Sequence, residues 1–255
     1  MSNILKHFNI PKSGKTKQRI AIKDIIVQLN LSTKDKKILK SEIDSIYLVG
    51  VLDLETIRIQ SYIGEDYLCE AIYMLHVKLK ANSHFSALNE KLQMAFPNPL
   101  VIVYQLGEKI ILSSAPKRIN KNFKGKSVIE EIYTTTIFFR DIKHELFLKH
   151  LNLQNIKALN LKEFYESLTD YIYSERLIDL LGEYPSQIPN TSELKQTIKL
   201  IESEKASLNA YNESYKQASM MAEKMDIHMK IQKIEKNIDN IILKLKEGFI
   251  DGSVK

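Results

Sequence analysis

The C-terminal part of the chain is the feature that most constrains the fold. Between Pro189 and Gly248 the chain has neither proline nor glycine, the two residues that most often interrupt helices. The segment is rich in Lys, Glu, Ile, Asn, Met and Leu, so residues 191–247 are predicted to be helical. One unbroken helix of that length would span on the order of 85 Å. A helix this polar cannot form a core alone, so it must pack on the domain, on itself or on a partner.

Apolar residues in this segment follow coiled-coil spacing in two registers. The first set alternates steps of three and four residues: Leu208, Tyr211, Tyr215, Ala218, Ala222, Met225 and Met229. The second set keeps the rhythm but is shifted by two: Ile231, Ile234, Ile238, Ile241 and Leu245. Two alternatives follow. Either the helix turns a different face to its surroundings after residue 230, or the chain folds back near residues 226–228.

The preceding residues, 1–183, are predicted to form an α+β domain with helices packed on a mixed sheet of about six strands. Apolar or alternating runs predict strands at 46–52, 56–59, 67–79, 100–106, 109–115 and 128–139. Ser32 is a good N-cap for a helix, Gly107 suits a hairpin turn, and Gly182 suits a helix C-cap. Residues 12–19 are predicted to be a basic loop. Two prolines in 184–190 indicate a linker, which separates the domain from a helical arm at 191–255.

Positive charge is concentrated in two short parts of the chain. The net charge is +6, yet residues 1–40 alone contain ten Lys/Arg against two Asp. Residues 108–126 contain six Lys/Arg against one Glu, and the rest of the chain is net acidic. If the two parts met in space, they would form one phosphate-binding surface. The candidate nucleic-acid-binding residues are Lys12, Lys15, Lys17, Arg19, Lys117, Arg118 and Lys121. The alternative is that these are ordinary solvated surface lysines.

No catalytic motif accompanies this charge. Ser13-Gly14-Lys15-Thr16 resembles the end of a phosphate-binding loop, but the glycine required five positions before Gly14 is Asn9. The six histidines and the single Cys69 have no zinc-site spacing. No catalytic residue, metal ligand or cofactor is therefore predicted, and enzymatic activity is left open, with a non-enzymatic role preferred.

A metal-dependent nuclease is the enzymatic alternative. Such an enzyme needs several carboxylates around a hard cation, often with a nearby lysine. Acids do cluster along the strand region: Asp53, Glu55, Glu65, Asp66 and Glu70. However, the strand that should carry an acid two residues before a lysine has His76-Val77-Lys78 instead.

Composition also predicts the cellular setting. No stretch approaches the roughly 20 apolar residues of a membrane span, and no signal-peptide pattern precedes the domain. The single Cys69 cannot form an intrachain disulfide. A cytoplasmic protein with no membrane association is expected.

Several short motifs resemble those of an uncharacterised prokaryotic family, domain of unknown function 4391. They are Phe8-Asn9-Ile10-Pro11-Lys12, Glu42-Ile43-Asp44-Ser45-Ile46-Tyr47, Lys117-Arg118-Ile119-Asn120 within residues 112–120, and Glu130-Glu131. Members of that family are often encoded beside helicases and DNA methyltransferases of restriction-like, phage-defence loci. The resemblance implies an accessory role in DNA handling and carries over no catalytic residue.

The expected function is therefore a non-enzymatic accessory protein of a bacterial restriction- or phage-defence-type system, which contacts nucleic acid through its basic segments. The resemblance implies a helicase or DNA methyltransferase as partner. Residues 191–247 would dock on that partner or on a second copy of the chain. The alternatives are the divergent metal-dependent nuclease and a purely structural protein-interaction module.

Overall fold

The structure is a computed structural model that describes residues 3–123, 127–135, 142–186 and 191–251. The chain divides into two compact units, Met1–Glu175 and Arg176–Lys255. The predicted linker at 184–190 lies within the second unit, and its residues 187–190 lie outside the described residues.

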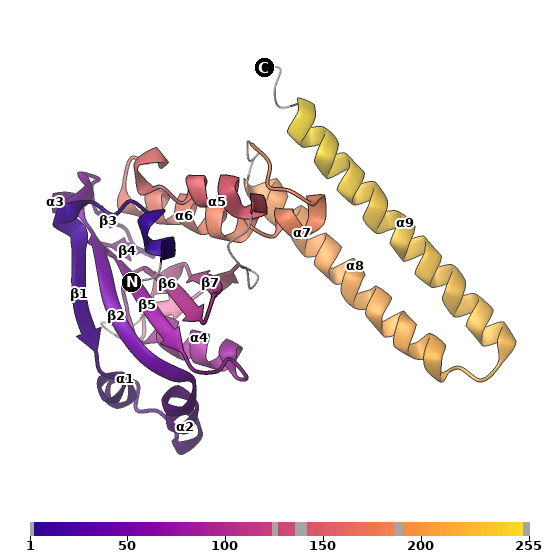
Figure 1. The fold of residues 1–255 in the computed structure, drawn as a ribbon, viewed down its shortest axis with the longest axis horizontal. Helices are drawn as coiled ribbons and strands as arrows, with labels where there is room; N and C mark the ends of the chain where they lie inside the picture. The colour runs from indigo at the N-terminus through magenta and orange to yellow at the C-terminus, as the bar shows by residue number, and fades with distance from the viewer. Residues whose placement is uncertain (1–2, 124–126, 136–141, 187–190, 252–255) are drawn as a thin grey trace. The chain divides into compact units, whose positions relative to one another are not determined.

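A six-stranded mixed sheet forms the centre of the first unit (Figure 1). Its strand order is β1 (Lys15–Ile20), β2 (Ile43–Leu52), β5 (Ile72–Leu79), β6 (Leu100–Leu106), β7 (Lys109–Ser114) and β10 (Tyr133–Thr134). Neighbouring strands are antiparallel except β5 and β6, which are parallel and joined by α4 (Phe85–Met94). Gly107 in the β6–β7 turn has φ +61°, a conformation that glycine adopts without strain. The predicted α+β class and mixed sheet are confirmed.

One face of the sheet is covered by α1 (Ile22–Gln28), α2 (Thr33–Glu42) and α4. The core on this face is aliphatic and includes Ile25, Leu39, Leu88, Leu92, Leu75, Ile102 and Tyr104. The predicted start of α2 is confirmed, because the Ser32 side chain accepts a hydrogen bond from the Asp35 N–H.

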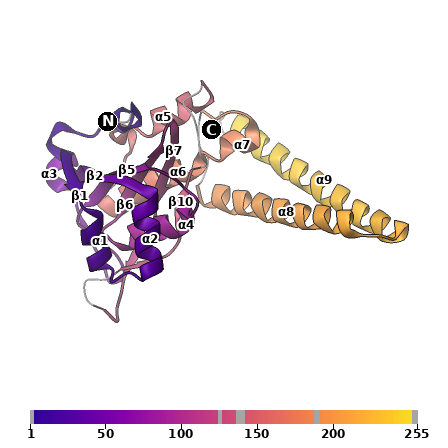
Figure 2. The ribbon, with the colours of Figure 1, turned by 60° about the horizontal axis from the view of Figure 1, so that its bottom comes forward.

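The opposite face is covered by α6 (Leu161–Ser174), with η1 (Asn3–Lys6), α5 (Glu145–His150) and η4 (Leu153–Asn155) nearby (Figure 2). Tyr165 of α6 reaches the ends of β6 and β7, where its hydroxyl accepts from the Ala115 N–H at 2.8 Å and lies 2.8 Å from the Leu100 carbonyl oxygen. The Leu153 N–H donates to the Phe8 carbonyl oxygen at 3.1 Å. The sheet is thus the middle layer of three.

Three local predictions for the first unit were wrong in detail. Residues 12–19 are not a loop but a 3-10 turn, η2 (Lys12–Gly14), followed by the edge strand β1. The polar residues of β1 form a strand because their backbone groups hydrogen-bond with β2. Residues 56–59 do not form a strand, since the side chains of Asp53 and Thr56 make a capping box that starts the single helical turn α3 (Leu54–Ile57). The predicted strand at 128–139 is divided between β9 (Ser127–Ile129) and β10, and residues 136–139 lie outside the described residues.

Two small hairpins complete the first unit. Strand β3 (Tyr62–Ile63) pairs with β4 (Leu68–Cys69), and β8 (Lys117–Ile119) pairs with β9. The Ile119 N–H donates to the Asp66 carbonyl oxygen at 2.7 Å, which links the two hairpins. Two segments that are distant in the sequence are thereby brought together.

The second unit is a helical hairpin preceded by a short helix, α7 (Leu177–Leu181), which ends on Gly182 with φ +87°. Helices α8 (Thr191–Gln217) and α9 (Met221–Asp251) pack on each other, and their buried isoleucines are Ile198, Ile201, Ile227, Ile231 and Ile238. Of the two alternatives, the fold-back is the one found, at residues 218–220 and thus earlier than residues 226–228.

The first predicted seam of the arm was wrong where it crosses this turn. Met225 and Met229 are 61% and 64% exposed, because residues on the two sides of a reversal cannot continue one straight stripe. In the second seam, Ile231 and Ile238 are buried, and Ile234, Ile241 and Leu245 are partly buried. Among the described residues, no helix is both long and apolar enough to cross a membrane.

Candidate functional site

The first basic segment, which we call the β1 segment, consists of Lys12, Lys15, Lys17 and Arg19. Lys12 lies in η2 and the other three lie on β1, and all four side chains are exposed. None of the four makes a hydrogen bond or ion pair through its side chain with any described residue. These four charges are therefore available to a ligand.

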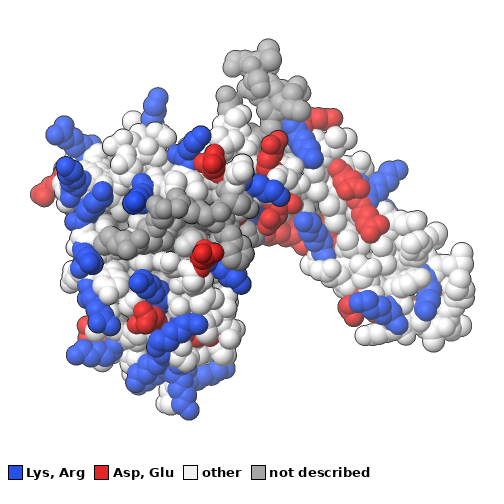
Figure 3. Space-filling model, viewed as in Figure 1, with Lys and Arg blue, Asp and Glu red and all other residues white. Residues whose placement is uncertain are grey.

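The strand places these cations together. Lys15, Lys17 and Arg19 follow one another along β1 at every second position, although a bulge between Lys15 and Gln18 interrupts the regular alternation of sides. Arg19 is opposite Tyr47 of β2 and Lys15 is opposite Gly50, with a bulge between them. Lys78, at the end of β5, is also exposed and is paired with Ser45 of β2. On the face of the first unit shown in Figure 3, Lys and Arg side chains gather while Asp and Glu are few.

The second basic segment, which we call the β8 segment, consists of Lys117, Arg118 and Lys121, and Lys117 is buried. Lys117 is 6% exposed, and its Nζ donates to the carbonyl oxygens of Phe96 and Asn98 at 2.6 and 3.0 Å. Burial lowers the pKa of Lys117 to about 7. Two of its three donors are used inside the protein, so Lys117 fixes the loop between α4 and β6 rather than presenting a charge at the surface.

The two other cations of the β8 segment are paired. Arg118 Nε lies 3.1 Å from Glu130 Oε1, and Lys121 Nζ lies 2.7 Å from Asp66 Oδ1. The hydrogen bond and charge of Lys121 lower the pKa of Asp66. Their charge is thus largely compensated, although both side chains remain exposed.

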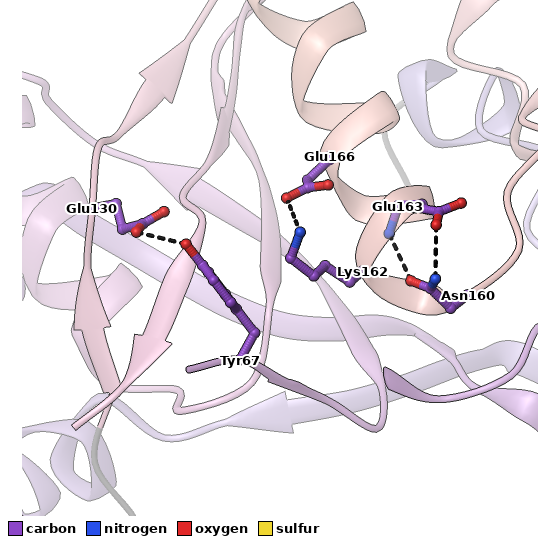
Figure 4. A network of polar contacts seen from close by, with 6 residues as sticks. All are labelled: Tyr67, Glu130, Asn160, Lys162, Glu163 and Glu166. Carbon is purple, nitrogen blue, oxygen red and sulfur yellow. Dashed lines mark hydrogen bonds and ion pairs between the residues drawn. The ribbon is translucent and has the colours of Figure 1, made fainter. Parts of the chain in front are cut away.

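Polar contacts join Tyr67 of the β3–β4 hairpin to Glu130, next to β9, and to the first turn of α6 (Figure 4). The Tyr67 hydroxyl donates to Glu130 at 2.8 Å, and this hydrogen bond is the main reason that the pKa of Tyr67 is raised. Lys162 pairs with Glu166 at 2.6 Å and lies 4.9 Å from the centre of the Tyr67 ring. Nearby, Asn160 caps α6 through the Glu163 N–H. The motif residues of the β8 segment therefore lie in a network that ties β8–β9 to the 62–69 hairpin.

The two basic segments are not neighbours in the sheet. Three strands, β2, β5 and β6, lie between β1 and β7, from which the β8 segment follows. At 4.7–4.9 Å between adjacent strands, β1 and β7 are roughly 19 Å apart. A surface that joined both segments would have to cross this distance.

The acidic residues considered for a nuclease are spread over several roles. Asp53 caps α3 and Asp66 pairs with Lys121. His76 is buried beside Gln105, at 3.0 Å, and burial lowers its pKa. Among the residues that the structure describes, no three side chains of His, Cys, Asp or Glu could jointly hold a metal ion. Cys69 is buried, which raises the pKa of its thiol to about 12.

The sequence showed Asp66 and Glu130 but not that they pair with the β8 segment, because only the folding of the two hairpins brings them to Lys121 and Arg118. It also missed Lys78, which the sheet register brings to the β2 surface. An alternation of basic residues at 15, 17 and 19 was the one local signal for β1.

The fold and the site define an α+β protein whose second unit is a helical hairpin. On one sheet edge it carries cations that have no partner among the residues the structure describes. The family model described as domain of unknown function (DUF4391) matches residues 8–238, so the chain belongs to this family. No curated protein and no solved structure matches the chain.

Proposed function

We propose that this protein is a non-enzymatic accessory protein that binds nucleic acid through its β1 segment. The observation that carries the proposal is the contrast in pairing: the four cations of the β1 segment are exposed and uncompensated among the described residues, whereas those of the β8 segment are buried or paired. The resemblance adds the setting, a restriction- or phage-defence-type system with a helicase or DNA methyltransferase as partner.

Uncompensated cations on a strand suit a phosphate backbone. Alternate residues of a strand are roughly 6.6 Å apart, so the three cations of β1 form a row along the edge of the sheet. A row of this kind binds by releasing counterions, which requires no base-specific contact. The competing explanation is that charged residues on an edge strand serve to prevent pairing with other chains.

The experiment is a salt titration of binding, measured as fluorescence anisotropy of a labelled duplex and a labelled single strand. The variant carries Gln at 12, 15, 17 and 19, and the matched control carries Gln in place of Lys233, Lys236, Lys244 and Lys246, four exposed lysines of α9. We expect the first variant to reduce the slope of log K against log salt by roughly 3 to 4, at about 0.9 for each phosphate that is no longer neutralised. The control should leave the slope unchanged.

Absence of binding to either oligonucleotide at low salt would contradict the nucleic-acid part of the proposal. An equal loss in both variants would show that only net charge matters and that β1 has no special role.

We also propose that the helical hairpin docks on a protein partner. Met220, Met221, Met225 and Met229 are between 61% and 74% exposed, and exposed methionine surfaces adapt to varied partners. Copurification of a helicase or methyltransferase after nuclease treatment is expected, and it should be lost when Met221, Met225 and Met229 are replaced by Glu. Copurification unaffected by these substitutions would contradict this role of the methionines.

A further inference from the structure

Arg58 has an unusual backbone conformation for a long side chain. Its φ is +58° and its ψ is 32°, in the left-handed region. The other non-glycine residues with positive φ among those described are Asn9 and Asn30, and asparagine tolerates this region well. For arginine the conformation costs on the order of 1–2 kcal/mol. A strained residue of this kind suggests that its side chain is needed where it stands.

The local sequence fixes this position. The capping box of Asp53 and Thr56 starts α3, and the single turn ends when the Arg58 N–H donates to the Leu54 carbonyl oxygen at 3.1 Å. Glycine is the usual residue at such a helix end, because it has no side chain to strain. The backbone at position 58 must therefore adopt the left-handed conformation, and the residue that adopts it is an arginine, with a guanidinium side chain.

Arg58 lies at a hollow of about 260 Å³ in the first unit. Its walls are mainly aliphatic: Pro11, Ile57, Ile59, Leu153 and Ile156 line it together with Phe164. The remaining lining residues are Thr56, Gln154 and Arg58 itself. The hollow is thus an apolar pocket with few polar groups, the usual composition of a small-ligand site.

Close packing of η2 on β2 and α3 builds one wall of this pocket. A Cβ on Gly14 would lie 2.6 Å from the Val51 carbonyl oxygen and 3.3 Å from Thr56 Cβ. The contact with Val51 means that only glycine allows η2, with Pro11 before it, to pack this closely on β2, with α3 beside it. The pocket wall depends on that approach.

The charge at the pocket is positive and uncompensated. Of the residues that the structure describes, no acidic one lines the hollow. The side chain of Arg58 is exposed and has no hydrogen-bond or ion-pair partner among the described residues, and the same holds for Lys12, which follows Pro11 directly. The guanidinium offers the planar fork that binds a carboxylate through two parallel hydrogen bonds.

We propose that this pocket binds a branched aliphatic group that carries a carboxylate, with the carboxylate on Arg58 and the aliphatic group against Ile57, Ile59 and Leu153. A nucleobase would fit less well, since base binding relies on exposed aromatic rings and Phe164 is only 1% exposed. The same chemistry occurs at the C-terminus of a peptide that ends in leucine and in a free branched-chain carboxylic acid. This inference is independent of nucleic-acid binding by β1.

The full chain is titrated with three probes: acetyl-Ala-Ala-Leu, the same peptide as its C-terminal amide, and 4-methylpentanoate. Binding is measured from the chemical shifts of the backbone amides. We expect the peptide acid to shift resonances of residues 56–59 and 153–156 and to bind about tenfold more tightly than the amide, a difference of about 1.4 kcal/mol. Tighter binding of the peptide acid than of 4-methylpentanoate would identify a peptide terminus as the source, and the reverse would identify a free acid. No shift at these residues with any probe would overturn the proposal.

Arg58→Asn is the decisive variant, because asparagine keeps the left-handed backbone while removing the guanidinium. It should weaken the peptide acid about tenfold and leave the amide unchanged, and Arg58→Lys should restore part of the loss. Lys37→Asn, at an exposed lysine of α2 that belongs to neither proposed site, is the control and should bind like the unmodified chain. Equal affinity of the acid for Arg58→Asn and the unmodified chain would overturn the role of Arg58, and circular dichroism would establish that each variant is folded.

Discussion

The β1 and β8 segments carry similar sequences of basic residues but use them in opposite ways. In the β1 segment the cations project from an edge strand and meet no acid among the described residues. In the β8 segment one lysine is buried on backbone carbonyl oxygens, and its two neighbours are held by Glu130 and Asp66. The difference teaches that formal charge in a sequence is not the same as charge available to a ligand. The predictions below test this contrast.

Removing the Lys117 side chain should have the largest effect on stability. Lys117→Ala leaves the carbonyl oxygens of Phe96 and Asn98 without their donor, and we expect a loss of roughly 3 kcal/mol in the free energy of unfolding. Lys15→Ala, on exposed β1, should change it by less than about 0.5 kcal/mol. Urea unfolding measures both. Equal effects would show that the two lysines are in similar environments.

The lowered pKa of Lys117 should appear as pH-dependent stability. The folded protein releases the Lys117 proton near pH 7, whereas the unfolded chain keeps it until near its ordinary pKa of 10.5. Between these values the unfolded state binds more protons, so the free energy of unfolding should rise with pH, by roughly 2 kcal/mol from pH 7 to 9.

Urea unfolding across this pH range, compared with Lys117→Met, isolates the contribution of this one lysine. The methionine variant should lack the rise that the lysine causes. The same slope in both proteins would refute the assignment to Lys117.

Paired substitutions compare the two segments directly in binding. Replacing Lys15 and Lys17 by Gln should weaken binding to a DNA duplex by about tenfold at low salt, or about 1.4 kcal/mol. Replacing Arg118 and Lys121 by Gln removes the same formal charge but should weaken binding less than about twofold, because those cations are already compensated. Fluorescence anisotropy distinguishes the two cases, and equal losses would mean that ion pairing does not limit availability.

Releasing the paired cations should have the smallest effect, and in the opposite direction. Asp66→Asn together with Glu130→Gln removes the carboxylates from Lys121 and Arg118. We expect binding to tighten by about threefold, since exposed ion pairs are individually weak. The same anisotropy measurement applies, with Glu65→Gln and Glu70→Gln, two exposed acids of the same region, as control.

Local signals in the sequence predicted the parts of the fold that depend on local interactions. The N-cap at Ser32 and the turn at Gly107 are properties of a few consecutive residues, and both were confirmed. The mixed sheet followed from apolar strands such as β5 and β6. Strand β1 was missed because its residues are polar, and only its pairing with β2, far along the chain, makes it a strand.

The candidate site was less predictable for the same reason. Nothing near Lys117 in the sequence distinguishes it from Lys15, since its burial depends on the loop after α4. Asp66, which neutralises Lys121, comes from the β3–β4 hairpin, and Glu130, which neutralises Arg118, follows β9. The Arg58 pocket had no sequence signal, because an arginine in place of the expected glycine hides the helix end.

The position of β1 at the end of the strand order has a consequence for growth of the sheet. On the side away from β2, its backbone amides and carbonyls have no strand partner among the described residues. Such an edge can template the addition of a strand from another chain. Exposed lysine side chains on the edge strand oppose this addition by charge repulsion. Neutralising the β1 cations would then expose the protein to edge-to-edge polymerisation, so that a surface suited to ligand binding would also be what keeps the molecules separate.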